Sequence, residues 1–167
     1  MTRPDRPGTM HLILVHHGEA VSPDVDSRRP LSPSGQAEVE RLAAGVASRA
    51  VRPAIVWHSG KLRARQTAEE FRRACNPLAE FGATKDLQPD DPPQWIRDRL
   101  RGESRDILIV GHFPHLQRVL ALLLNAAESD VNFPLHGAVA LASSDGGERW
   151  REIWRLEPGG AKSSPPG

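Results

Sequence analysis

The sequence has little of several features that define whole classes of protein. Its 167 residues contain one cysteine, Cys75, which excludes an intramolecular disulfide framework and a metal cage built from several cysteines. Lysine and arginine number 22 against 21 aspartates and glutamates, and the resulting net charge of +1 argues against a protein that binds nucleic acid by bulk charge. The longest apolar run, Val119 to Leu124, is far shorter than the ~20 residues that span a bilayer.

The two ends of the chain differ in composition from the rest. Residues 1–9 carry charges and prolines but no apolar stretch, so we expect a flexible tail and no signal peptide there. Residues 158–167 are rich in glycine, serine and proline, which predicts a second flexible tail. Since a domain takes about 100–200 residues, the sequence predicts a single domain over residues 10–157. With so little cysteine and no apolar span, we expect a cytoplasmic protein.

Hydrophobic patterns alternate between strand and helix along this domain. Short apolar runs predict strands at residues 11–15, 54–58 and 107–110. Apolar residues at helical spacing predict helices over residues 34–50, 62–75, 93–101 and 116–127. A turn sequence, Asp145-Gly146-Gly147, separates two final segments as in a β-hairpin, residues 138–142 and 149–156. The order predicts an α/β fold of three layers (α/β/α), whose mainly parallel sheet has helices on both faces and an antiparallel strand at one edge.

Histidines, an arginine and glycines follow the three predicted parallel strands. The first strand is followed by His16-His17-Gly18-Glu19, the second by a segment from Ser59 to Thr67 that contains Arg63, and the third by Gly111-His112. In sheets of this kind, ligands bind at the carboxyl ends of the strands. We therefore expect these residues to line one crevice.

Together these segments resemble the histidine phosphatase superfamily, also called the phosphoglycerate-mutase-like family. Its motifs are similar to His16-His17-Gly18-Glu19, to Ser59-x-x-x-Arg63-Ala-x-Gln-Thr and to Gly111-His112. Two further segments look like its compact SixA-type phosphohistidine phosphatase branch: Arg29-Pro30-Leu31-Ser32-x-x-Gly35 and Leu87-x-Pro89. The resemblance implies a phosphoglycerate-mutase-like fold for residues 11–156.

The resemblance also implies a role for each matching residue. His17 matches the nucleophile that is transiently phosphorylated, Arg63 matches the arginine that clamps phosphate oxygens, and His112 matches the histidine that completes the pocket. A neutral imidazole is a competent nucleophile near neutral pH, and a planar guanidinium can hold two phosphate oxygens at once. Two further contacts to phosphate are expected from Ser59 and from His136, which falls where relatives carry serine or threonine.

Position 16 departs from the family, which has arginine there. A phosphoryl group gains charge on its oxygens during transfer, and the loss of a fixed charged donor commonly costs on the order of 10²–10³ in rate. Three interpretations follow for a pocket with His16. The bound phosphate keeps His16 protonated, or Arg28 or Arg29 replaces the missing guanidinium, or the chain binds phosphate with little turnover.

The substrate prediction depends on the general acid. The candidates are Glu19, then Asp90 and Asp91, and none of them matches the glutamate of larger relatives. Phosphohistidine leaves as an imidazole, which needs less help from an acid than an alkoxide does. We therefore expect a phosphatase that acts on phosphohistidine of a protein. Two alternatives stay open: a weak or inactive module that binds phosphate or phosphoprotein, and a phosphomonoesterase for small molecules.

A metal site is a further alternative. His16, His17, His112 and Glu19 could surround one ion, because imidazoles suit zinc. Arg63 would repel a divalent cation in the same crevice, so we expect neither a metal nor a cofactor. The expected partners are a phosphorylated protein or a small phosphate ester, with no nucleic acid and no membrane.

Overall fold

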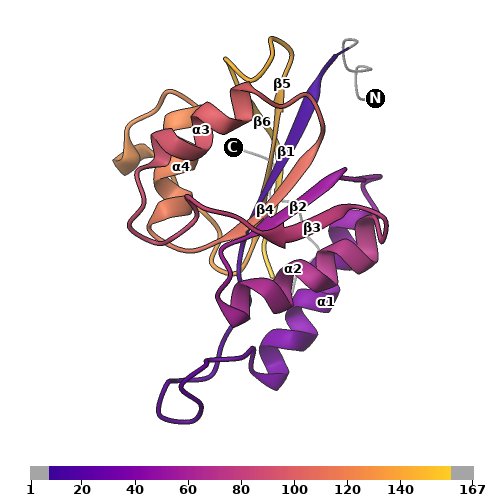
Figure 1. The fold of residues 1–167 in the computed structure, drawn as a ribbon, viewed down its shortest axis with the longest axis vertical. Helices are drawn as coiled ribbons and strands as arrows, with labels where there is room; N and C mark the ends of the chain where they lie inside the picture. Colours follow the sequence, from indigo (N-terminus) through magenta and orange to yellow (C-terminus); the bar gives the residue numbers. More distant parts are fainter. Residues whose placement is uncertain (1–7, 159–167) are drawn as a thin grey trace.

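The computed structural model describes residues 8–158, and the predicted tails, residues 1–9 and 158–167, lie almost entirely outside this range. Within the described residues, strands and helices alternate and end in a β-hairpin (Figure 1). The elements are β1 (Met10–His16), α1 (Pro33–Ala47), β2 (Ile55–His58), α2 (Leu62–Cys75), β3 (Glu80–Ala83), α3 (Pro93–Arg101), β4 (Ile107–Gly111), α4 (His115–Leu123), the 3-10 turn η1 (Glu128–Asp130), β5 (Ala138–Ser143) and β6 (Arg151–Leu156). None of the helices in this range is long and apolar enough to cross a membrane.

The strands form one sheet in the order β3-β2-β4-β1-β5-β6. The first four of this order pair in parallel, whereas β5 runs antiparallel to both β1 and β6. Helices α1 and α2 cover one face of the sheet, and α3 and α4 cover the other (Figure 1). The predicted three-layer α/β fold with an antiparallel hairpin at one edge is therefore confirmed.

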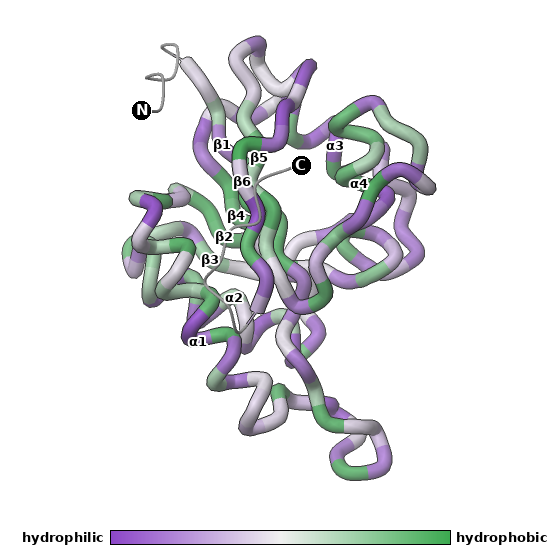
Figure 2. Tube along the Cα trace, turned by 180° about the vertical axis from the view of Figure 1, so that it is seen from behind, coloured by the Kyte–Doolittle hydropathy of each residue, from purple (hydrophilic) through white to green (hydrophobic). Residues whose placement is uncertain are grey.

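Alternate residues of the central strands point into two separate hydrophobic cores. In β1, Ile13 and Val15 pack against α1 and α2, whereas Leu12 and Leu14 pack against α3 and α4. Because both faces are covered, these strands are continuous apolar runs, and Figure 2 shows them as a green centre of the molecule. The two cores fix the sheet from both sides and so hold the ends of its strands in place.

The connection from β1 to α1 packs closely against the first turn of that helix. The N-cap residue of α1 is Ser32, whose Oγ accepts a hydrogen bond from the backbone N–H of Gly35 at 2.9 Å. A Cβ on Gly35 would lie 2.1 Å from the carbonyl oxygen of Glu19, and one on Gly18 would lie 2.4 Å from Val39. Only glycine allows this approach, which fixes the backbone that follows β1.

The structure differs from the predicted elements in three places. Strand β3 was not predicted, because its four residues lie at the edge of the sheet, are half-buried or exposed and show no apolar alternation. Helix α1 ends at Ala47 and not at Ala50 as predicted. Ala50 has a left-handed φ of 61°, which is incompatible with a continuing α-helix. Helix α4 ends at Leu123, before the predicted Ala127, and Asn125 adopts a φ of 53° that ends the helical geometry.

Candidate active site

The carboxyl ends of β1, β4 and β2 lie side by side, and each is followed by residues predicted for the site. Strand β1 pairs with β4 in a register that sets His16 opposite Gly111, and β4 also pairs in parallel with β2. The residues that follow these strands, His17, His112 and Ser59, therefore emerge at one edge of the sheet. The ring centroids of His17 and His112 are 5.0 Å apart.

His17 is buried, and its contacts define which ring nitrogen is reactive. Its Nδ1 lies 2.7 Å from the carbonyl oxygen of Gly18. A carbonyl oxygen can only accept, so Nδ1 carries the proton and Nε2 keeps its lone pair. Burial lowers the pKa of His17 to about 4, and the charge of Arg63 acts in the same direction. The ring is thus neutral near pH 7, with a nucleophilic Nε2.

Arg63 lies in the first turn of α2 and faces His17. Its Nε donates to Nε2 of His17 at 3.4 Å. Thr67, one turn along the helix, donates to the carbonyl oxygen of Arg63 and accepts a hydrogen bond from the backbone N–H of Gly18. This threonine therefore ties α2 to the backbone beside His17, and the guanidinium and the imidazole are held in one geometry. The free N–H groups of the helix start also favour an anion.

His112 approaches His17 from the end of β4 and contacts Ser59. The Ser59 Oγ and the His112 Nε2 are 2.6 Å apart. Nδ1 of His112 is buried and has no hydrogen-bond partner within residues 8–158. An unpaired buried polar atom costs about 1–3 kcal/mol, which a ligand atom reaching the ring would relieve. Burial, followed by the charges of His17 and Arg63, lowers the pKa of His112 to about 3, so this ring is neutral as well.

His16 stands where the resemblance implies an arginine, and its ring lies between two others. It stacks on Phe113 at a centroid distance of 3.9 Å and on His136 at 4.9 Å. Its Nδ1 accepts a hydrogen bond from the backbone N–H of His136 at 2.8 Å, so the proton of the neutral ring is on Nε2. Burial, and next the charge of His17, lowers the pKa of His16 to about 2. These contacts favour a neutral donor at position 16 over the protonated histidine that one interpretation requires.

The two arginines predicted as replacements for the guanidinium lie in different surroundings. Arg28 forms an ion pair with Asp26 at the surface, with an N–O distance of 3.3 Å. Arg29 is half-buried, and its Nε donates to the carbonyl oxygen of Val21 at 3.1 Å. Its charge contributes to lowering the pKa of the groups on both sides of the pocket, His17 and Arg63. Arg29, and not Arg28, is therefore placed to add a second positive charge to the site.

None of the three predicted acids contacts His17 in the described structure. The Glu19 carboxylate is exposed and accepts hydrogen bonds from the hydroxyls of Ser32 and Ser34, at 2.8 and 3.1 Å. These bonds lower its pKa, which makes it a poorer proton donor. Asp90 is exposed, and Asp91 accepts a hydrogen bond from the backbone N–H of Gln88.

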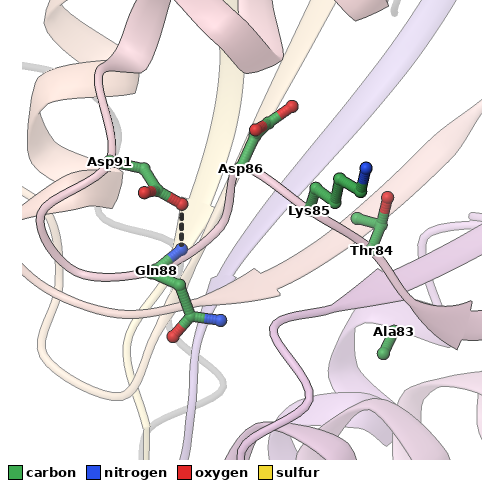
Figure 3. A pocket seen from close by; sticks show the side chains of 6 residues that line it. All are labelled: Ala83, Thr84, Lys85, Asp86, Gln88 and Asp91. Carbon is green, nitrogen blue, oxygen red and sulfur yellow. Dashed lines mark hydrogen bonds between the residues drawn. The ribbon is translucent and has the colours of Figure 1, made fainter.

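A pocket of about 540 Å³ lies beside the site, at the carboxyl end of β3. Figure 3 shows the side chains that line it: Ala83, Thr84, Lys85, Asp86, Gln88 and Asp91. The side-chain amide of Gln88 donates to the carbonyl oxygen of Ser59 at 2.8 Å and so links the pocket wall to the candidate site. Gln88 was not predicted for this role, because its hydrogen bond, like the stacking of Phe113 on His16, depends on loop geometry that no motif encodes.

The metal alternative concerned His16, His17, His112 and Glu19, but the structure gathers a different set. One ring nitrogen from each of His16, His17 and His136 lies within 4.8 Å of the others. Nδ1 of His16 already accepts a hydrogen bond, which leaves a proton on its other nitrogen. The guanidinium of Arg63 touches His17 Nε2 at 3.4 Å and opposes a cation there. The donor set is therefore better suited to an oxyanion than to a metal ion.

Comparison with known proteins agrees with the geometry. The model of the histidine phosphatase superfamily (branch 1) matches residues 12–89. The fold is similar to that of the protein histidine phosphatase SixA complexed with tungstate, with a TM-score of 0.79 and 23% identity over 89% of this chain and 97% of that one. No curated protein is similar enough in sequence to count as a match.

Two further solved structures share the architecture. One, from Agrobacterium tumefaciens, is assigned as a phosphohistidine phosphatase SixA and has a TM-score of 0.74 and 24% identity over 89% of this chain and 98% of that one. The other is phosphoglycerate mutase from Plasmodium falciparum, with a TM-score of 0.69 and 18% identity over 95% of this chain and 94% of that one. The resemblance to the histidine phosphatase superfamily is thus confirmed, by sequence over residues 12–89 and by the phosphoglycerate-mutase-like fold over most of the chain.

Proposed function

We propose that this protein is a phosphatase that removes the phosphoryl group from phosphohistidine on a protein, through a phosphohistidine intermediate on His17. The observation that carries the proposal is the hydrogen bond from His17 Nδ1 to the carbonyl oxygen of Gly18. It leaves the lone pair of Nε2 beside the guanidinium of Arg63, at 3.4 Å. A nucleophile and an oxyanion clamp at this spacing are what a phosphoryl transfer in two displacements needs.

The charges around His17 support this chemistry. Arg63 and Arg29 both act on the pKa of His17, and the charge of Lys61 contributes to lowering that of His112. We propose that Arg29 supplies the second guanidinium in the absence of an arginine at position 16. His16 adds a neutral N–H donor from Nε2. Positive charge at the peripheral oxygens stabilises the transferring phosphoryl group, because the protein's main task in this reaction is positioning and charge stabilisation.

The surroundings of the acids support a phosphoramidate substrate. Glu19 is held as a carboxylate by two serine hydroxyls, so it is a poor donor to a leaving group. A leaving imidazole has a pKa near neutrality and needs little protonation by the enzyme, unlike the alkoxide of a sugar phosphate. The similar structure described as a protein histidine phosphatase holds tungstate, a tetrahedral oxyanion, and so fits the same assignment.

The test is release of inorganic phosphate from a phosphohistidine peptide and from p-nitrophenyl phosphate. We expect faster release from the peptide, and a loss on the order of 10⁴-fold or more in His17→Ala. His11→Ala is the matched control, because His11 lies in the same strand at the end far from the site. Peptide binding without release would support a binding module, and preference for the ester would support a phosphomonoesterase. Unchanged release in His17→Ala would refute the mechanism.

A further inference from the structure

His136 is held in the site by more contacts than a side chain that only touches phosphate would need. Its backbone N–H donates to Nδ1 of His16 at 2.8 Å, and its ring stacks on the ring of that residue. Its own Nδ1 lies 2.7 Å from the carbonyl oxygen of His17. The residue also adopts a φ of 55°, a left-handed conformation that side chains other than asparagine, aspartate and histidine seldom adopt. Such strain is retained where the surrounding structure holds the residue in place.

The contact with the His17 carbonyl determines where His136 keeps its lone pair. Since the carbonyl oxygen can only accept, Nδ1 of His136 carries the proton and Nε2 is the basic atom. The ring is half-buried, and Nε2 has no hydrogen-bond partner within the described range of the chain. This atom is therefore open to water and to ligands.

The other groups that could accept a proton are already engaged or, like Nδ1 of His112, are buried away from water. The lone pair of His17 is the nucleophile itself, and Nδ1 of His16 accepts the backbone N–H of His136. Nε2 of His112 is 2.6 Å from the Ser59 hydroxyl. The Glu19 carboxylate accepts from two serine hydroxyls. His136 alone among these residues combines a lone pair that has no partner with access to water.

His136 is also close enough to act on a group attached to the nucleophile. One of its ring nitrogens is within 4.8 Å of one in His17, and the two ring centroids are 6.0 Å apart. A phosphoryl group on Nε2 of His17 would therefore lie beside the His136 ring, on the side from which a water molecule can approach both. General-base catalysis requires a base within hydrogen-bond reach of the proton, directly or through one water.

Resting on the proposed phosphatase function, we propose that His136 is the general base that activates water when phospho-His17 is hydrolysed. The water oxygen forms a bond to phosphorus, and the bond from phosphorus to Nε2 of His17 breaks with its electron pair returning to that nitrogen. The proton of the water passes to Nε2 of His136, which becomes an imidazolium whose Nδ1–H still donates to the His17 carbonyl. The imidazolium then returns the proton to solvent, and inorganic phosphate leaves.

The test separates the two half-reactions in the variant His136→Asn. Asparagine tolerates a left-handed φ and keeps the backbone N–H to His16, but it has no basic nitrogen. Phosphoramidate serves as the phosphoryl donor, and phospho-His17 is followed by mass and by ³¹P resonance. We expect the hydrolysis of phospho-His17 to slow about 100-fold or more, and its formation, in which His136 only contacts the phosphate, to slow much less. Leu135→Ala is the control, since Leu135 is the exposed neighbour in the same loop.

Chemical rescue adds a readout that a structural role would not move. Free imidazole should raise the rate at which phospho-His17 of His136→Asn releases inorganic phosphate, and it should leave the wild-type rate unchanged. Equal slowing of both half-reactions, or no rescue, would overturn the assignment of His136 as base. If the wild type forms no phosphoenzyme from phosphoramidate or from a phosphohistidine peptide, the proposed function itself fails and the base with it.

Discussion

Replacing His16 with arginine introduces the residue that the resemblance implies at this position, and the structure predicts that the variant loses stability and activity. If His16 were simply a lost cation, His16→Arg would raise turnover. The contacts of His16 argue otherwise, because its imidazole stacks on the rings of Phe113 and His136 and its Nδ1 accepts a hydrogen bond. We expect His16→Arg to be less stable than the wild type and slower to hydrolyse phospho-His17.

The size of the effect follows from the contacts that the imidazole makes. Arginine has no acceptor for the backbone N–H of His136, and leaving such a group unpaired costs about 1–3 kcal/mol. Each of the two ring stacks, with Phe113 and with His136, contributes about 0.5–1.5 kcal/mol beyond its buried area. The free energy of unfolding should therefore fall by about 2–6 kcal/mol. For a domain of this size, that lowers the midpoint of thermal unfolding by about 4–24 °C.

Thermal and urea unfolding measure the stability, with and without tungstate as an anion that offsets the added charge. Phosphate release from phosphoramidate measures turnover, and trapping of phospho-His17 shows which half-reaction has slowed. His11→Arg makes the same chemical change at the other end of β1, where the side chain pairs with Asp106 and is partly exposed. That control should stay within about 1 kcal/mol of the wild type.

The opposite result would refute the reasoning. If His16→Arg is as stable as the wild type and turns over faster, the contacts of His16 contribute little to stability. The histidine would then be only the loss of a positive charge in the site. A stable variant with unchanged hydrolysis of phospho-His17 would also show that the position of His136 does not depend on this ring.

Two further predictions concern stability. Burial lowers the pKa of three site histidines from 6.5 to about 2, 4 and 3, so the fold keeps them neutral while the unfolded chain protonates them. The free energy of unfolding should therefore decrease as the pH falls from 6.5 to 4, by up to about 4 kcal/mol per pH unit in urea titrations, and a flat profile would count against neutral rings. Gly35→Ala should cost about 1–3 kcal/mol in thermal unfolding, because its Cβ would lie 2.1 Å from the Glu19 carbonyl oxygen. Gly82→Ala, with nothing within 4 Å, should cost far less, and equal losses in the two variants would contradict the steric argument.

The sequence was a good guide to the fold where hydrophobic burial decides the structure. The run Ile107–Val110 reads as a strand covered on both faces, and it lies at the centre of the sheet as β4. Strand β3 escaped prediction because an edge strand buries little and carries no such pattern. His115 was not assigned to the core from the sequence but is fully buried, since it lies one turn before Val119 on the inward stripe of α4. That stripe was visible in the sequence and would have placed it correctly.

The candidate site, too, could be predicted only in part. The rule that ligands bind at strand ends brought His17, Arg63 and His112 to one edge, because it depends only on strand order and direction. The arrangement of Phe113, His16 and His136 could not be predicted, because it depends on a left-handed residue in a loop after α4. Likewise, the sequence suggested Glu19 as a general acid because it lies two residues after His17. Only the structure shows that Ser32 and Ser34, at the start of α1, donate hydrogen bonds to its carboxylate.

The direction of the strands has a practical consequence for anyone who attaches the protein to a surface or a reporter. The described chain enters the sheet at Met10, at the end of β1 farthest from His17. It leaves at Leu156, which pairs with Ala138; Ala138 in turn pairs with Val15, so this end of β6 lies beside the edge that carries the candidate site. A bulky fusion joined on the amino-terminal side of Met10 should leave the pocket open to a large phosphorylated protein, whereas the same fusion placed just after β6 would crowd its approach.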